Sequence, residues 1–137
     1  MRNNIGRFIP VILSGLLPLL PCACGGSRSD VDDGQVRVEY RVEMIEGGPE
    51  CLSRVQYLDR NGNTRTERDP GVTEWSERFY AGDGTRLFLE AVIDCGRVEV
   101  SLYLDRSRVA RDRSPRRATI EGTLRVDEEG NATFEED

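Results

Sequence analysis

Strict alternation of apolar and polar side chains, most regular between Val36 and Met44, is the feature that most limits what this chain can fold into. Within residues 36–44 five apolar side chains alternate with four charged ones. A period of two is that of a β-strand with one face in a core and the other in water. The sequence therefore predicts a half-buried strand at this point.

The same pattern returns along the rest of the chain, and turn residues separate its segments. Asn61-Gly62 is typical of a tight hairpin, and the polar segment after it predicts an edge strand. No segment after Cys24 repeats with the period of a helix. These features predict an all-β fold, an immunoglobulin-like antiparallel β-sandwich of about seven short strands. Besides the first strand, we expect strands at residues 52–59, 64–68, 75–80, 87–93, 98–105 and 119–126, with a short terminal one at 132–134.

Two large aromatic residues, Trp75 and Phe79, share one face of the strand expected at residues 75–80. We expect both in the core, with Trp75 at its centre between the two sheets. Stacking of the Trp75 indole on a ligand is the alternative.

The first 24 residues have the three parts of an export signal. Arg2 and Arg7 make a positive start, residues 8–20 are apolar, and Ala23-Cys24 comes shortly after them. Thirteen apolar residues fall short of the roughly 20 that cross a bilayer. The end of this segment resembles a bacterial lipobox, in which the cysteine after a small residue is lipidated and becomes the mature N-terminus.

The resemblance to a lipobox sets the expected domain organisation. We predict a lipoprotein signal peptide over residues 1–23, lipidation of Cys24, a flexible tether over 24–35 and a β-sandwich domain over 36–137. An ordinary secreted protein and an uncleaved membrane anchor are the alternatives.

We expect the protein to be exported and held on a cell membrane by its lipid. Enterobacterial lipoproteins that stay at the inner membrane carry an aspartate after the lipidated cysteine, whereas this chain has Gly25. If the cell has two membranes, the resemblance therefore implies the outer one.

Two cysteines, Cys51 and Cys95, remain after export. In an oxidising compartment the default expectation is a disulfide. It would close a loop of about 45 residues and stabilise the domain by about 3–4 kcal/mol in the chain-entropy model. Free buried thiols and redox chemistry are the alternatives.

The mature chain is acidic, and all its basic residues are arginines. Without Arg2 and Arg7 it keeps 17 arginines against 25 acidic residues, a net charge of −8. Such a domain repels nucleic acid and anionic membrane surfaces, which argues against either as its partner. The partners we expect are the membrane, reached through the N-terminal lipid, and an envelope protein.

One stretch, residues 106–117, departs from this acidic character. It could be a solvated edge and loop, or a site that docks an acidic partner, a lipid headgroup or an anionic polymer. The candidate interaction residues are Arg106, Arg108, Arg111, Arg113, Arg116 and Arg117.

The composition offers little for catalysis. The chain has no histidine, which removes the commonest general base and the Ser-His and Cys-His nucleophile pairs. Two cysteines without histidine do not make a soft-donor metal site. We therefore expect no catalytic residues, no metal and no cofactor; paired carboxylates in a cleft are the alternative for an enzyme.

The order of the strand and turn motifs resembles the extracytoplasmic β-sandwich of the small mycobacterial membrane protein (MmpS) family and related bacterial lipoproteins. The motifs that carry this resemblance are, in order, Val38 to Val42, residues 55–62, Trp75-Ser76, residues 87–91 and residues 98–110. The resemblance covers about residues 36–112. It implies an immunoglobulin-like fold and a role as accessory to a membrane transporter. The chain departs from the family in its lipobox, in Glu74 where proline is usual, and in its cysteine positions.

The function we expect is a non-catalytic, lipid-anchored interaction module of the cell envelope, with service to a membrane transport or assembly complex as one interpretation. An extracytoplasmic ligand- or polysaccharide-binding domain is the first alternative, and an enzyme with carboxylate catalysis is the second.

Overall fold

Residues 34–137 contain nine β-strands, and most of them are the alternating segments. The computed structural model describes residues 34–137, so the expected signal peptide (1–23), Cys24 and most of the expected tether (24–35) lie outside the described residues. The strands are β1 (Val36–Glu46), β2 (Leu52–Leu58), β3 (Thr64–Arg68), β4 (Glu74–Ala81), β5 (Arg86–Ile93), β6 (Arg97–Leu104), β7 (Ser107–Ser114), β8 (Arg117–Val126) and β9 (Ala132–Glu136). One 3-10 turn, Pro49–Cys51, joins β1 to β2. Among the described residues no helix is long and apolar enough to cross a membrane.

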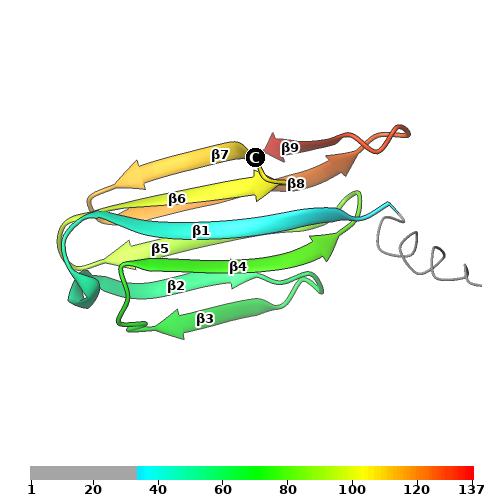
Figure 1. Cartoon of the computed structure of the whole chain (residues 1–137). Coiled ribbons are helices and arrows are strands. Elements are labelled where there is room, and N and C mark those ends of the chain that lie inside the picture. Colours follow the sequence, from blue (N-terminus) through cyan, green and yellow to red (C-terminus); the bar gives the residue numbers. More distant parts are fainter. Residues whose placement is uncertain (1–33) are drawn as a thin grey trace, which may run out of the picture. The chain divides into compact units, whose positions relative to one another are not determined.

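The strands pair into two antiparallel sheets that pack face to face (Figure 1). We call the sheet with the order β4-β1-β6-β7 sheet A, and the sheet with the order β3-β2-β5-β8-β9 sheet B. Three hairpins, β2–β3, β6–β7 and β8–β9, lie within a sheet, and the remaining connections cross from one sheet to the other. The predicted all-β antiparallel sandwich is confirmed.

The strand count and order differ from the expectation in detail. The described residues hold nine strands rather than about seven, and residues 107–114 form an edge strand, β7, where no strand was expected. Strand β7 lacks the alternating pattern because most of its side chains are solvent-exposed, including that of Val109. The strand order also differs from the A-B-E-D and C-F-G order of a constant-type immunoglobulin domain.

The alternating apolar side chains form one core between the sheets. The five apolar residues of the first predicted strand are all buried, as are Leu87, Leu89, Ala91 and Ile93 of β5. The predicted inward faces of β1 and β5 are thus confirmed. Strand β3 is exposed along its whole length and lies at the edge of sheet B, as expected.

The centre of the core is Tyr40, not Trp75. Trp75 and Phe79 lie on β4, the edge strand of sheet A, where they are partly buried and pack against the core from its rim. The Trp75 ring lies 5.1 Å from that of Tyr57 in sheet B, so it does pack between the sheets. The expectation that Trp75 is central is therefore wrong, because strand order places its strand at an edge.

Tyr40 joins the two sheets through its hydroxyl group. Its side chain is fully buried on β1, and the hydroxyl donates to the Leu58 carbonyl oxygen at 2.8 Å and accepts from the Phe88 amide at 3.3 Å. The recorded pairing of β2 with β5 ends one position earlier, at Tyr57 and Leu89. The hydroxyl thus bridges the Leu58 carbonyl and the Phe88 amide, which would form a backbone hydrogen bond with each other if the ladder continued.

The predicted hairpin at Asn61-Gly62 is confirmed. Asp59 Oδ1 accepts hydrogen bonds from the amides of Asn61 and Asn63, and its Oδ2 pairs with Arg65 Nε at 2.9 Å. Gly62 has a φ of 81°, a conformation that favours glycine. These contacts, led by that with Arg65, hold the pKa of the Asp59 carboxyl below its ordinary value.

Candidate functional site

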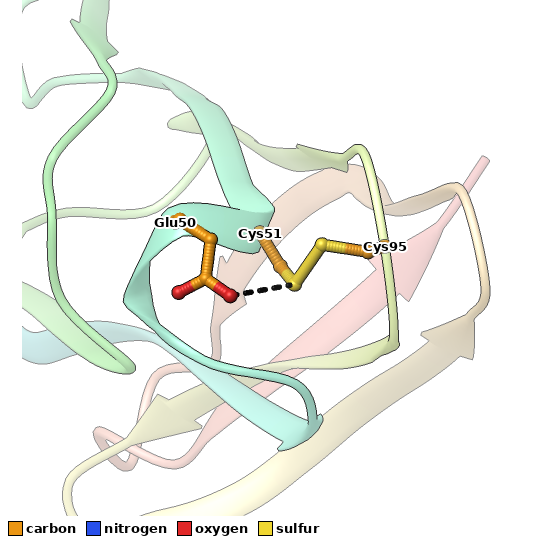
Figure 2. Close-up of side chains that lie close together, drawn as sticks. All are labelled: Glu50, Cys51 and Cys95. Carbon is orange, nitrogen blue, oxygen red and sulfur yellow. Dashed lines mark hydrogen bonds between the residues drawn. A yellow bond between two sulfur atoms is a disulfide. The ribbon is translucent and has the colours of Figure 1, made fainter.

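The disulfide between Cys51 and Cys95 is confirmed. Cys51 ends the 3-10 turn before β2, and Cys95 lies in the turn between β5 and β6 (Figure 2). The sulfurs are 2.03 Å apart and the Cα atoms 4.9 Å apart, within the usual range for a disulfide. The bridge ties the start of one strand of sheet B to the turn that follows its neighbour.

Glu50 lies beside the disulfide but does not make it a metal site. Its Oε2 is 4.0 Å from Cys51 Sγ, and Figure 2 shows this approach as a dashed line. Both sulfurs are bonded to each other, so neither is a thiolate that could hold a metal ion, and neither carries a proton to donate. Of the three neighbouring groups, Glu50, Cys51 and Cys95, only the glutamate could therefore bind an ion.

The six candidate arginines of residues 106–117 do not form one surface. Arg106 lies in the turn before β7, and Arg116 and Arg117 lie at the opposite end of that strand. Eight residues of strand at about 3.3 Å each separate the two ends by roughly 26 Å. The stretch is therefore an exposed edge with a turn at each end, and its residues divide among different sites.

Several of these arginines pair with carboxylates, of which Glu99 is buried and Glu90 half-buried. Arg113 Nε lies 2.8 Å from Glu99 Oε2, and Arg111 Nε lies 3.6 Å from the same oxygen. Arg117 Nε lies 3.6 Å from Glu90 Oε2 in sheet B. The interpretation as a solvated edge, with charge relieved by neighbouring acids, fits these three residues.

The outer face of sheet A carries further paired charges along β1. Glu39 is buried, and its Oε2 accepts from Arg41 Nε at 3.0 Å, while its Oε1 lies 3.9 Å from Arg37 Nη2. The hydrogen bond from Arg41 to Glu39 is the main reason that the pKa of the Arg41 guanidinium is raised. Arg41 also lies over the Tyr103 ring, with its Cζ 4.3 Å from the ring centroid.

Arg106 belongs to a different group, which the fold assembles from three segments. Arg37 of β1, Arg78 and Tyr80 of β4, and Arg106 of the β6–β7 turn line an open hollow of about 370 Å³, together with Phe79. We call this the arginine hollow. Arg37 and Tyr80 are direct neighbours across the β1–β4 ladder, and Glu39 and Arg78 form the next outward-facing pair.

The charge in the arginine hollow is only partly neutralised. Glu39 faces Arg78 across the ladder but makes its ion pairs with Arg41 and Arg37 instead. Among residues 34–137 no ion pair is recorded for Arg78 or Arg106. Within the described part of the chain, two guanidinium groups of the hollow thus have no carboxylate partner.

A second hollow, of about 440 Å³, lies at the other end of the same two strands. Its lining includes Arg41, Glu43, Glu74 and Ser76. Glu43 and Glu74 are direct cross-strand neighbours, an arrangement of like charges that is unfavourable. The outer face of β1 and β4 is therefore cationic where β1 begins and acidic where β1 ends.

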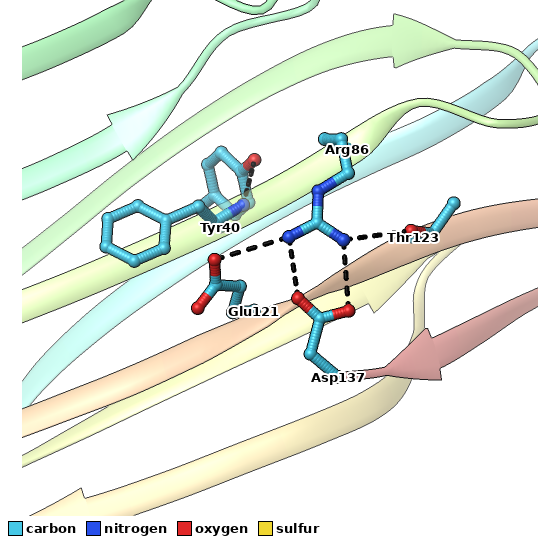
Figure 3. Close-up of polar contacts among 6 residues, drawn as sticks. Tyr40, Arg86, Glu121, Thr123 and Asp137 are labelled. Carbon is cyan, nitrogen blue, oxygen red and sulfur yellow. Dashed lines mark hydrogen bonds and ion pairs between the residues drawn. The ribbon is translucent and has the colours of Figure 1, made fainter.

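The shifted carboxyl groups give no support to acid–base chemistry. Contacts with backbone amides, led by Asn131, lower the pKa of Asp127, and Arg86 lowers that of Asp137. A catalytic acid requires a raised carboxyl pKa, which is the opposite direction. In Figure 3 the Arg86 guanidinium joins Asp137, Glu121 and Thr123, so this cluster ties β5, β8 and the end of the chain together.

The sequence did not single out Arg37, Arg78 or Tyr80. Each lies on the polar face of an alternating segment, where a charged or phenolic side chain is ordinary. Only the pairing of β4 with β1, which are separated in the chain by β2 and β3, brings them together. Alternation of Arg78 with Phe79 was the one signal that Arg78 points outward.

The chain matches no protein-family model and no curated protein sequence. The resemblance to the small mycobacterial membrane protein family therefore stays an expectation.

Proposed function

We propose that the protein is a non-catalytic, lipid-anchored interaction module of the cell envelope that serves a membrane transport or assembly complex as an accessory. The observation that carries export is the Cys51–Cys95 disulfide. Disulfides persist in oxidising compartments outside the cytosol, which agrees with an export signal ending at Cys24. The lipid on Cys24 would then keep the domain at a membrane surface.

The surface chemistry supports interaction rather than catalysis. Carboxylates of sheet A such as Glu39 and Glu99 are buried beside arginines, an arrangement that orders a charged surface. With no histidine in the chain, proton transfer at neutral pH lacks its usual carrier. A rigid face patterned with both charges is suited to recognising a partner of complementary pattern.

Replacement of the proposed lipidation site tests the anchoring. Cys24→Ser should abolish metabolic labelling with a radioactive fatty acid and release the protein from the membrane fraction, because Cys24 is the lipid attachment site we predict. The matched control is Cys22→Ser, which should keep both the label and the membrane association. Persistent labelling of the Cys24→Ser protein would refute the assignment.

A role in a complex is tested by crosslinking the lipidated protein in its own membranes. The proposal expects a membrane transport or assembly protein to be crosslinked to the outer face of sheet A. A control crosslinker attached to the outer face of sheet B, on the side of the sandwich away from sheet A, should not capture it. Recovery of the protein only as an uncomplexed species would contradict the accessory role.

A further inference from the structure

We propose that the arginine hollow binds the phosphate groups of anionic lipids in the membrane to which the protein is anchored, and thereby holds the domain end-on to that surface. The inference rests on the proposed lipid anchoring. The hollow is lined by Arg37, Arg78 and Arg106 with Tyr80 beside them. Guanidinium groups bind phosphate oxygens through paired, charge-assisted hydrogen bonds, which suits three of them around one open site.

Available charge distinguishes Arg78 and Arg106 from the arginines of sheet A that pair with Glu39 or Glu99; Arg97 and Arg108 of the same sheet also have no ion pair among residues 34–137 but do not line the hollow. Arg111 and Arg113 are engaged by the buried Glu99, and Arg41 by Glu39. In the described part of the chain Arg78 and Arg106 have no recorded ion pair. The Asp105 carboxylate next to the hollow accepts a hydrogen bond from the Arg37 backbone amide at 3.0 Å, so it has a structural partner of its own.

Arg106 occupies a backbone position that favours glycine. Asp105 and Arg106 have φ values of 49° and 75°, so both central residues of the β6–β7 turn are left-handed. Hairpin turns of this kind usually place glycine at the second position, and a residue with a side chain is strained there. A non-glycine residue held in such a strained conformation is a feature that functional sites show.

The turn that carries Arg106 is also fixed to β1. The Asp105 amide donates to the Arg37 carbonyl oxygen at 2.8 Å, in addition to the contact with the Asp105 carboxylate. Arg37 and Arg106 therefore come from segments that are hydrogen-bonded together. This rigidity reduces the entropy lost when an anion is bound between them.

The hollow lies where the folded domain follows the predicted tether. Arg37 is the second residue of β1, and 12 residues from 24 to 35 separate that strand from the lipid. A flexible chain of this length has a root-mean-square span of roughly 17–21 Å and reaches at most about 43 Å. The membrane is thus always within a short distance, so even weak binding to headgroups is favoured by a high effective concentration.

Overall charge and the exposed tyrosine favour one orientation at the membrane. The mature chain carries −8, so most of its surface is repelled by anionic lipid. The arginine hollow is the cationic end of the β1–β4 face, and Tyr80, which is 44% exposed, has the amphipathic ring typical of a membrane interface. A lipid anchor and a cationic patch each bind a membrane weakly, and together they hold the protein on it stably.

Energy transfer from Trp75, the single tryptophan, to dansyl-labelled headgroups tests the proposal on the full lipidated protein. The protein is reconstituted in vesicles of phosphatidylcholine alone, or of phosphatidylcholine mixed with anionic phosphatidylglycerol. We expect higher transfer with phosphatidylglycerol, and a return to the phosphatidylcholine level at high salt. Equal transfer in both kinds of vesicle would overturn the proposal.

The variant Arg37→Gln/Arg78→Gln/Arg106→Gln should lose the difference between the two kinds of vesicle. The matched control is Arg68→Gln/Arg97→Gln/Arg116→Gln, which removes the same charge from exposed arginines at the opposite end of the sandwich. The control should keep the difference. An equal loss in both variants would show that net charge and not the hollow sets the orientation.

Arg106→Gly separates lipid binding from a structural role. Glycine relieves the left-handed backbone, so the melting temperature should rise, while the difference in energy transfer should fall. A lower melting temperature together with lost transfer would assign Arg106 a structural role and overturn its place in the site.

Two other occupants are distinguished by the same samples. If millimolar inorganic phosphate abolishes the transfer difference, the hollow takes free phosphate. If the protein sediments as a dimer in neutral detergent and the hollow variant is monomeric, the occupant is a second copy. Either result would overturn lipid binding. Failure of the proposed anchoring is separate, because the protein would then not float with vesicles of either composition.

Discussion

The hydroxyl group of Tyr40 should contribute a measurable share of the stability of the sandwich. Tyr40→Phe keeps the aromatic contacts, with ring centroids 5.7 Å from Tyr57 and 5.4 Å from Phe79, and removes only the oxygen. The Leu58 carbonyl oxygen and the Phe88 amide then lose a partner inside the protein. An unsatisfied buried group costs about 1–3 kcal/mol.

The two contacts of Tyr40 are not equal, and both backbone groups are only partly buried. The bond to Leu58 is short at 2.8 Å, whereas the bond from Phe88 is long at 3.3 Å. We therefore expect Tyr40→Phe to lower the free energy of unfolding by about 2 kcal/mol. For a domain of this size that corresponds to a fall in Tm of roughly 8–16 °C.

Urea denaturation followed by Trp75 fluorescence measures this change. Tyr80→Phe is the matched control, because Tyr80 is 44% exposed and should change the free energy of unfolding by less than about 0.5 kcal/mol. If Tyr40→Phe is as stable as the unsubstituted protein, β2 and β5 close the gap by pairing Leu58 with Phe88. That result would refute the idea that the hydroxyl is required there.

The same group predicts loss of stability in alkali. Burial raises the pKa of Tyr40 well above its ordinary value of 10.0. Above pH 10 the unfolded chain therefore releases a proton that the folded protein retains, so stability is complete below pH 10 and falls as the pH rises. Tyr40→Phe should reduce this alkaline loss. Tyr57, whose pKa burial also raises, should leave a smaller residual dependence.

Three further perturbations test the rim, the disulfide and the end of the chain. Trp75→Ala should lower the free energy of unfolding by about 2–3 kcal/mol, below the 3–5 kcal/mol of a central tryptophan, since Trp75 is only partly buried. An unchanged free energy of unfolding in urea denaturation would place Trp75 outside the core. Cys51→Ser/Cys95→Ser should cost about 4 kcal/mol for the loop between residues 44 positions apart, and a non-reduced digest of the unsubstituted protein should contain the linked peptides. Arg86→Gln should speed hydrogen exchange in β9 without unfolding the core, because Asp137 loses its partner. In the unsubstituted protein the same effect should appear as the pH falls below the ordinary Asp137 pKa of 3.8. Unchanged exchange in β9 would refute the role of this cluster.

Local pattern was enough to predict most strands and their buried faces. Alternation identified Val38, Tyr40 and Val42 as inward-facing, and each is buried. Asn61-Gly62 predicted a hairpin, and cysteine counting predicted the Cys51–Cys95 bridge, both of which are confirmed. These features depend on neighbouring residues or on a count, so no knowledge of strand order is needed.

Strand β7 and the position of Trp75 could not be predicted in the same way. An exposed edge strand such as β7 has no need of an alternating face, so its arginines gave no strand signal. Trp75 carried the expected inward register, but its distance from the centre depends on which strand lies beside β4. Register within a strand is a local property, whereas strand order depends on pairings between distant segments.

By itself the sequence determined that this chain forms amphipathic strands, has an acidic surface and carries two cysteines able to pair. The tertiary structure alone decided that Tyr40 joins the sheets and that Arg37, Arg78 and Arg106 line one hollow. Each of these arginines is an ordinary polar-face or turn residue in the sequence. They become neighbours because β1 pairs with both β4 and β6, and an antiparallel register aligns the start of one strand with the ends of the other two.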